Sequence, residues 1–291
     1  MPNLCTKRRA NREALAFHAV RVPTIETLPM KQQLLDALPA TLYLRLKYWD
    51  YRLGHRARYA ESQKMRTLTT EQGYSYKPFD ERKAIFVHIP KCAGVAVNRA
   101  LFGNLAGGHT TLDEYLNIFE PACIDRYFKF TIVRNPWDRL VSAFFFLRSG
   151  GMDQKDHAGF VKEFGHLEDF KCFVRDWVNR DNIWRWHQFR PQCHYMLEKR
   201  GKVKLDFVAF LENIDQDFPR ISQSMGLTCS LPRANSSEHR SYMDYYDAET
   251  ADIVASVYAD DIRMLGYNFD NSNLRTQLAQ RDKGKVYALD A

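Results

Sequence analysis

The chain lacks any long apolar run. No stretch of about 18 consecutive apolar residues, the length that crosses a membrane, occurs among its 291 residues. The first residues, MPNLCTKRRANREALAF, are basic but contain no apolar segment of the kind that secretory signals carry. We therefore expect neither a transmembrane helix nor a secretory signal.

Paired cysteines are also missing. The six cysteines are scattered, without a C-x-x-C pair, at Cys5, Cys92, Cys123, Cys172, Cys193 and Cys229. This spacing argues against a zinc cluster and a disulfide scaffold, and it favours a reducing compartment. Carboxylates show no clustering of the kind that holds Mg²⁺. We expect a cytoplasmic protein that requires no metal.

Positive charge is concentrated near the start of the chain. Residues 1–66 contain 13 Lys and Arg against 5 Asp and Glu, a net charge of +8, whereas the whole chain carries +7. The remaining residues therefore sum to −1. A basic region of this kind either faces an anionic membrane or polymer, or is a solvated surface.

Residues 31–66 predict a basic amphipathic helix. Its apolar residues recur at helical spacing, and Pro39 is expected to kink or restart the helix; these residues are Leu35, Leu38, Leu42, Leu46, Trp49 and Leu53. Basic residues surround them at Arg45, Lys47, Arg52, Arg56 and Arg58. Such a helix either makes peripheral contact with the inner membrane surface or packs its apolar stripe onto its own domain. Both alternatives stay open.

Strand-like and helical segments alternate farther along the chain. Buried strands are expected at 84–89, 128–133 and 205–210, and helices at 95–102, 136–147, 213–225 and 248–265. This alternation is typical of parallel βαβ units. We predict an α/β, P-loop-like three-layer fold with a central parallel sheet. The expected divisions are a helical extension and linker (1–80), the α/β domain (81–271) and a tail (272–291).

The first strand leads into a segment suited to anion binding, FVHIPKCAGVAV (86–97). A turn from strand to helix exposes unpaired backbone N–H groups at the positive end of the helix. Gly94 lets the backbone approach an oxyanion, and Lys91 supplies a mobile positive charge. The Walker pattern G-x-x-x-x-G-K-[ST] is absent. Taken alone, the segment is also compatible with a tight turn and a solvent-facing lysine.

A second such segment is TIVRNPWDRLVSAFF (131–145). Arg134 ends a strand, and Arg139 and Ser142 follow in the next helix, so that Arg134 and Ser142 can reach one phosphate. Because parallel sheets bind ligands at the carboxyl ends of their strands, the two segments suit a ligand with two separated anionic groups.

HIPKCAG followed by IVRNPWDRLVSAFF resembles the membrane-associated (carbohydrate, family 2) sulfotransferases, whose donor is 3′-phosphoadenosine 5′-phosphosulfate (PAPS). Further similarity lies in RPQCHYM (190–196), DFVAFLENIDQDFPRI (206–221) and YYDAETADIVASVYADDIRMLGYNF, so that it covers about 84–269. The resemblance implies in-line transfer of a sulfuryl group from PAPS to a hydroxyl of a carbohydrate or glycolipid.

Donor contacts follow from the resemblance. They are Pro90, Lys91, Cys92, Ala93, Gly94, Val95 and Ala96 for the 5′-phosphosulfate, Arg134, Arg139 and Ser142 for the 3′-phosphate, and Arg240 in a loop folded over the donor. The family commonly has Thr or Ser where this chain has Cys92, Val95 and Ala96. Backbone N–H groups and Lys91 must therefore carry more of the binding here.

Sulfuryl transfer needs a base near the acceptor and a cation near the leaving oxygen. Lys91 fits the second role. His109, in LAGGHTTLDEY, is the expected base, because its unperturbed pKa suits proton transfer and glycosaminoglycan-type relatives carry a functional histidine in this region. Alternatives are a loop histidine that caps a helix, and His194 as the base. Asp113 and Glu114 are candidates to orient His109.

The acceptor is expected along NIWRWHQFRPQCHYM, where Arg185, Arg190 and Gln192 could line a groove. Trp184 and Trp186 either stack on sugar rings or fill the core. We expect no nucleic-acid partner. Two other functions stay open on the sequence, a P-loop-like nucleotide-dependent kinase and a non-catalytic protein that binds anionic glycans.

Overall fold

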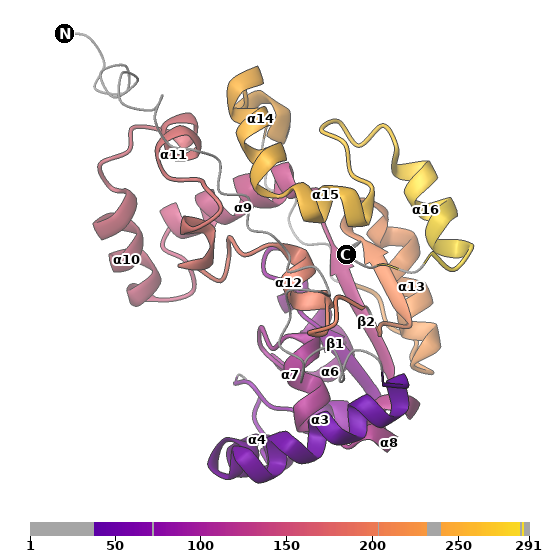
Figure 1. Cartoon of the computed structure of the whole chain (residues 1–291). Coiled ribbons are helices and arrows are strands. Elements are labelled where there is room, and N and C mark those ends of the chain that lie inside the picture. Colours follow the sequence, from indigo (N-terminus) through magenta and orange to yellow (C-terminus); the bar gives the residue numbers. More distant parts are fainter. Residues whose placement is uncertain (1–37, 72, 203, 232–239, 286, 288–291) are drawn as a thin grey trace, which may run out of the picture.

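A computed structural model describes residues 38–71, 73–202, 204–231, 240–285 and 287. At its centre lie three parallel strands in the order β1 (Ala84–Val87), β2 (Phe128–Val133) and β3 (Phe207–Phe210) (Figure 1). Val87 pairs with Thr131, and Val133 pairs with Phe210, so the carboxyl ends of the strands meet at one edge. The strands are almost wholly buried, as continuous apolar segments of parallel sheets require.

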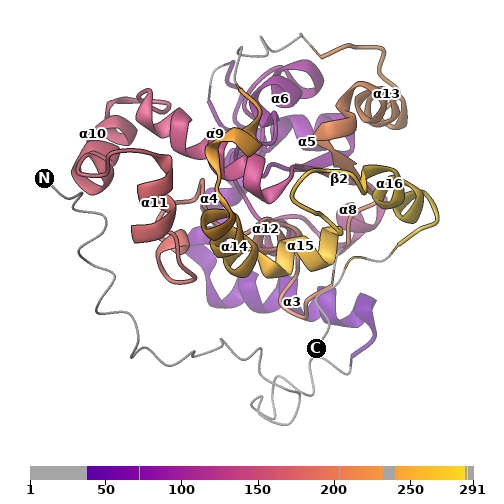
Figure 2. The same cartoon turned by 90° about the horizontal axis from the view of Figure 1, so that it is seen from above.

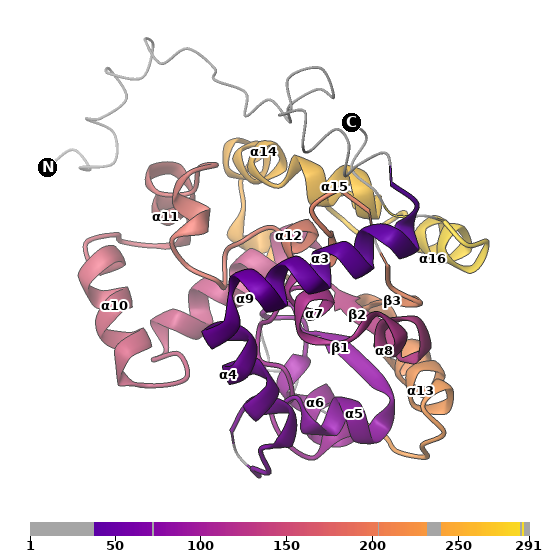
Figure 3. The same cartoon turned by 60° about the horizontal axis from the view of Figure 1, so that its bottom comes forward.

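Helices cover both faces of this sheet (Figures 2 and 3). One face carries α5 (Lys77–Arg82), α6 (Gly94–Phe102) and α13 (Ile214–Ser224), and the other carries α7 (Leu112–Ile118), α12 (Gln192–Met196) and α15 (Ala259–Leu265). The predicted α/β class with a central parallel sheet is confirmed. Tyr258 divides the helix expected over 248–265 into α14 (Ala248–Val257) and α15, which ends at Gly266 with φ of 75°.

The remaining helices lie around the sheet and beyond its carboxyl edge. They are α8 (Pro121–Arg126), α9 (Pro136–Arg148), α10 (Gln154–Phe164), α11 (Phe170–Asp176) and α16 (Leu274–Asp282). In Figure 1, α10 and α11 lie outside α9, on the side away from α16. Helix α9 begins with Pro136 in its first turn, capped by the Asn135 side chain, close to its expected bounds.

The helical N-terminal region is divided at His55, a residue that the sequence did not single out. The chain forms α3 (Ala40–Gly54) and α4 (Arg56–Thr67) on either side of it, and Pro39 is the N-cap of α3, which agrees with the expectation that a helix starts at this proline. Residues 31–37 lie outside the described part. Helix α5 crosses residue 80, the boundary expected between the linker and the α/β domain. Within the described residues, no helix has both the length and the apolar character to span a membrane.

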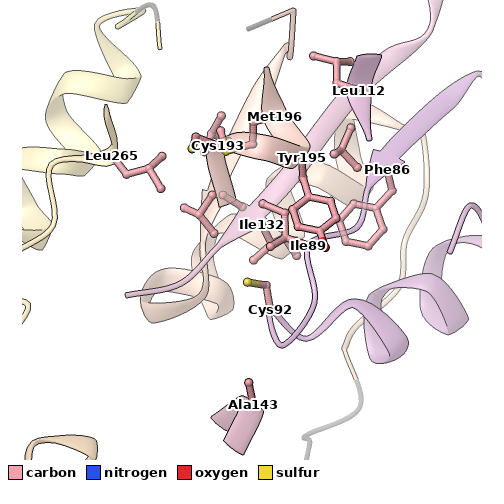
Figure 4. Packing of buried hydrophobic residues seen from close by; sticks show 14 of the residues in the cluster. Phe86, Ile89, Cys92, Leu112, Ile132, Ala143, Cys193, Tyr195, Met196 and Leu265 are labelled. Atoms are coloured by element: carbon pink, nitrogen blue, oxygen red, sulfur yellow. The ribbon is translucent and has the colours of Figure 1, made fainter. Parts of the chain in front are cut away.

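A continuous apolar core backs the carboxyl edge of the sheet. Figure 4 labels Phe86 and Ile132 of the strands, Tyr195 of α12 and Cys92 of the β1–α6 loop, which all belong to one cluster of buried hydrophobic residues. All four side chains are at least 99% buried. The loop that follows β1 therefore rests on a fixed base, which positions its backbone for the site described next.

Candidate active site

The loop between β1 and α6 has an unusual backbone. Lys91 and Ala93 have positive φ angles of 69° and 58°, a region that side chains other than glycine rarely adopt. Such conformations cost about 1–3 kcal/mol each and concentrate at ligand sites. Ala93 is the N-cap of α6 and caps it with no side-chain hydrogen bond. The first N–H groups of α6 therefore remain available to an anion.

The packing around position 94 gives a further reason for a glycine there, one that the sequence did not reveal. A Cβ at this position would lie 1.8 Å from the imidazole ring of His88, so only glycine leaves room for that ring. The expectation that Gly94 admits an oxyanion stays a prediction. What the packing adds is that the His88 ring lies directly against the first turn of α6.

Lys91 carries a charge that no described carboxylate neutralises. Its Nζ lies 3.7 Å from the centre of the Phe146 ring on α9, a cation–π contact. Burial, followed by the nearby positive charge of Arg134, lowers the pKa of Lys91 to about 8. Ser142 is half-buried one helical turn before Phe146 and hence on the same face of α9. Lys91 therefore contacts the face of α9 that also carries Ser142.

Arg134 links the β1–α6 loop to the start of α9. Its Nη1 donates to the carbonyl oxygen of Lys91 at 3.1 Å, while Nε and Nη2 donate to Asp138 at 2.8 and 2.7 Å. An arginine has five N–H donors, so two have no partner among the described residues and can donate to a ligand. The pairing with Asp138 raises the pKa of Arg134 against the opposing effect of burial. Arg134 therefore stabilises the β1–α6 loop and can also donate hydrogen bonds to a ligand.

Two residues predicted to bind ligands are buried, and their side chains bond to backbone groups. Arg139 is 2% exposed and donates to the carbonyl oxygens of Gln188 and Arg190, at 3.0 and 2.6 Å. Gln192 is fully buried; its amide accepts from the Arg134 N–H at 2.9 Å and donates to the Arg134 carbonyl at 2.8 Å. Both side chains therefore stabilise the backbone of the site, whereas the sequence predicted that they contact ligands.

Cys92 also points away from the loop's open side. Its thiol is fully buried and contacts the Pro90 carbonyl oxygen and the Gln192 side-chain oxygen at 3.7 Å each. Burial raises the pKa of this thiol to about 12, so it stays protonated. Of Cys92, only the backbone is placed to take part in anion binding.

Three histidines lie in a row beside the loop. Ring centroids are 4.3 Å apart for His88 and His109, and 4.9 Å apart for His109 and His187. Burial lowers the pKa of His109 to about 4 and also lowers those of His88 and His187. His109 Nδ1 lies 3.2 Å from the His88 carbonyl oxygen. Since a carbonyl only accepts, Nδ1 carries the proton, and Nε2 keeps the lone pair that a base needs.

The carboxylates expected to orient His109 have other partners. Asp113 forms an ion pair with Lys47 at 2.8 Å, and Glu114 completes a capping box with Thr111 at the start of α7. The expectation that Asp113 or Glu114 orients His109 is wrong, and the hydrogen bond to the His88 carbonyl oxygen orients its ring instead.

A pocket of about 450 Å³ brings the β1–α6 loop and the three histidines together, whereas Arg134 and Ser142 are not among the residues that line it. Its polar lining comes from His88, Lys91, Arg99, His109, His187 and Gln188, and its apolar lining includes Tyr74, Val95, Leu105, Phe146 and Met152. Pro90, Ala93, Gly94 and Ala96 complete the loop side. The sequence did not single out His187, Phe146 or Met152. The only signal for His187 was its place in an aromatic, basic stretch.

The predicted acceptor residues do not line this pocket. Arg185 is exposed and pairs with Glu163 at 2.8 Å, and Arg190 donates to the Trp184 carbonyl at 3.3 Å. His194, the alternative base, packs against Trp184 with ring centroids 5.0 Å apart, away from the pocket lining. Arg240 is exposed, and most of the loop preceding it lies outside the described residues.

Potential metal ligands are not clustered in the described ranges of the chain. Those ranges hold no group of three or more His, Cys, Asp or Glu side chains that could bind an ion.

Comparison with known proteins gives one match. The model of a family described as the Sulfotransferase family matches residues 75–268, which include the loop, β2, α9 and the whole pocket lining except Tyr74. No curated protein and no solved structure matches the chain.

Proposed function

The chain belongs to the sulfotransferase family, and on that basis we propose that it transfers a sulfuryl group from PAPS to a hydroxyl of a carbohydrate or glycolipid. The family match confirms the sequence resemblance and supports sulfuryl transfer in general. The identities of the donor and the acceptor are our proposal.

The observation that carries this proposal is the pairing of an unneutralised cation with a free helix terminus. The ammonium group of Lys91 lies over the Phe146 ring, with no described carboxylate beside it, and the start of α6, which has no side-chain cap, follows in the same loop. Together they suit the 5′-phosphosulfate, since a helix N-terminus and a lysine both favour an anion. Arg134 has two N–H donors without a partner in the described ranges, and together with Ser142 it suits the 3′-phosphate.

The proposed chemistry is a single displacement at sulfur. His109 Nε2 takes the proton of the acceptor hydroxyl as its oxygen bonds to sulfur. The bond between sulfur and the bridging oxygen of the 5′-phosphate breaks, and adenosine 3′,5′-bisphosphate leaves with the bonding electrons. Lys91 stabilises the charge that develops on that oxygen. The hydrogen bond from His109 Nδ1 to the His88 carbonyl supports this role, because it fixes the tautomer.

The pocket lining favours one of the two acceptor classes. Tyr74, Phe146 and Met152 give its wall apolar surface, and Tyr74 and Met152 are largely exposed at 49% and 61%. Aromatic faces stack on sugar rings, and an apolar wall accepts the less polar part of an amphiphile. We therefore propose a glycolipid in preference to a free, highly charged polysaccharide. A cytoplasmic site of action belongs to the same proposal and is supported by the scattered cysteines.

Thermal unfolding with adenosine 3′,5′-bisphosphate, AMP or ATP at equal concentration tests the donor. A ligand at about 100 times its Kd adds roughly 2.7 kcal/mol to the stability of the folded state. We expect stabilisation by the bisphosphate alone, and then labelled product from PAPS with a glycolipid mixture. Stabilisation by ATP alone would support a kinase. Binding of the bisphosphate without any transfer would support a non-catalytic anion-binding protein.

A further inference from the structure

Helix α3 has apolar side chains on two opposite faces. Its inner face buries Tyr43, Leu44 and Tyr48. Four large apolar side chains, which we call the outer stripe, point away from the protein; Leu42, Leu46, Trp49 and Leu53 are 44%, 45%, 49% and 60% exposed. Their spacing of four, three and four residues places them on one side of the helix. In Figure 3, α3 lies outside α7, with no described element in front of it.

Contacts on the inner face fix this orientation. Lys47 pairs with Asp113 of α7 at 2.8 Å, with only 8% of the lysine side chain exposed. Arg200 lies over the Tyr43 ring at 3.8 Å, and the Tyr48 hydroxyl is 2.6 Å from that of Tyr59. Rotating α3 to bury the outer stripe would break all three contacts. The sequence left open whether α3 packs or meets a membrane; one face packs, and the other is unpartnered among the described residues.

The surroundings of the outer stripe are strongly basic. Among the exposed side chains of residues 40–58, four are arginines and one, Asp50, is acidic; the arginines are Arg45, Arg52, Arg56 and Arg58. Arg52 lies over the Trp49 ring at 4.8 Å, so this charge borders the stripe directly. An apolar stripe edged with arginine matches a surface that is apolar inside and anionic outside.

We propose that the outer stripe of α3 docks on a membrane surface containing anionic lipids, with the helix lying in the interface. Charge complementarity favours this occupant over two others. A second copy of the chain, paired through a two-fold axis, would bring the arginines of both copies together, with only Asp50 to oppose them. Residues 1–37 carry six Lys and Arg against three Asp and Glu, so they are also basic. The proposal is independent of the donor and acceptor.

Cosedimentation of the full chain with vesicles tests the proposal. Vesicles of phosphatidylcholine with about 30% phosphatidylglycerol are compared with phosphatidylcholine alone. We expect binding to the anionic vesicles only, a blue shift of tryptophan emission that Trp49→Phe removes, and at least tenfold weaker binding in about 0.5 M salt, because salt screens the arginines. Equal binding to both vesicle types, or none to either, would overturn the proposal.

Matched variants locate the surface. Leu46→Glu/Trp49→Glu should weaken vesicle binding at least tenfold, whereas Leu68→Glu, equally exposed at 45% but outside the outer stripe, should leave it unchanged. Arg45→Gln/Arg52→Gln should weaken it too, against Arg275→Gln as the control. Circular dichroism and thermal unfolding check that each variant is folded. Vesicle binding that survives the Leu46/Trp49 change would overturn the assignment, as would a dimer in light scattering that the same change dissociates.

Discussion

The ammonium group of Lys91 lies 3.7 Å from the centre of the Phe146 ring, and burial and Arg134 lower its pKa to about 8. A partly desolvated cation beside an aromatic ring has lost much of its hydration without gaining a counter-ion. Binding an anionic donor would supply that counter-ion and raise the pKa again. The free protein therefore holds Lys91 in a state that favours anion binding.

Lys91→Ala should lower kcat at least a hundredfold, since it removes the cation beside the leaving oxygen, and should weaken binding of the bisphosphate. Steady-state kinetics and calorimetry measure the two effects. Lys162→Ala, an exposed lysine of α10, serves as the control. Transfer that survives Lys91→Ala would remove this residue from the mechanism.

The alkaline limb of the pH profile should also belong to Lys91. The charged form is the active one, so kcat/KM of the wild type should fall as pH rises above about 8, the pKa in the free protein. Lys91→Arg keeps its charge at all accessible pH, so its residual kcat/KM should show no such fall. An unchanged alkaline limb in Lys91→Arg would assign the titration to another group.

Gly94→Ala should destabilise the protein by about 1–3 kcal/mol, the usual cost of an overpacked core. Its Cβ would meet the His88 ring at 1.8 Å, so either the ring or the first turn of α6 must move. Gly54→Ala is the matched control, because no atom of the described residues lies within 4 Å of the place that its Cβ would take. Urea unfolding measures both, and Gly94→Ala should cost less stability in a His88→Ala background than in the wild type if the clash is the cause.

His109→Ala should lower kcat about 10²–10⁴-fold, the usual contribution of a general base, while the Kd of the bisphosphate stays within a factor of about two. His55→Ala, exposed at the α3–α4 junction, is the control. His187→Ala distinguishes the two pocket histidines. A larger loss of kcat in His187→Ala than in His109→Ala would transfer the role of base to His187.

The sheet and its edge could be predicted from the sequence, because apolar strand segments and the Pro136 helix start are local patterns. Side-chain partners could not. Gln192 and Arg139 look like ligand-binding residues in the sequence, yet their polar groups bond to backbone as far as 58 and 51 residues away, which only the folded chain brings near. His187 joins His109 by the same long-range packing.

The sequence likewise could not show which face of α3 points outward. Leu42, Leu46 and Trp49 have the spacing of a buried stripe, and the tyrosines that pack instead, Tyr43 and Tyr48, lie next to two of them in the chain. Which of two apolar faces turns inward depends on partners such as Asp113, 66 residues from Lys47.

Gln192→Leu should separate a structural role from the acceptor-binding role that the sequence suggested. Loss of the amide leaves the Arg134 N–H and carbonyl without partners, and a buried unsatisfied polar group costs about 1–3 kcal/mol. We expect a lower urea midpoint and a raised KM for PAPS, because Arg134 is displaced, with the acceptor KM nearly unchanged. Gln223→Leu, on the exposed side of α13, should alter none of these. A raised acceptor KM at unchanged stability would instead put the Gln192 amide against the acceptor.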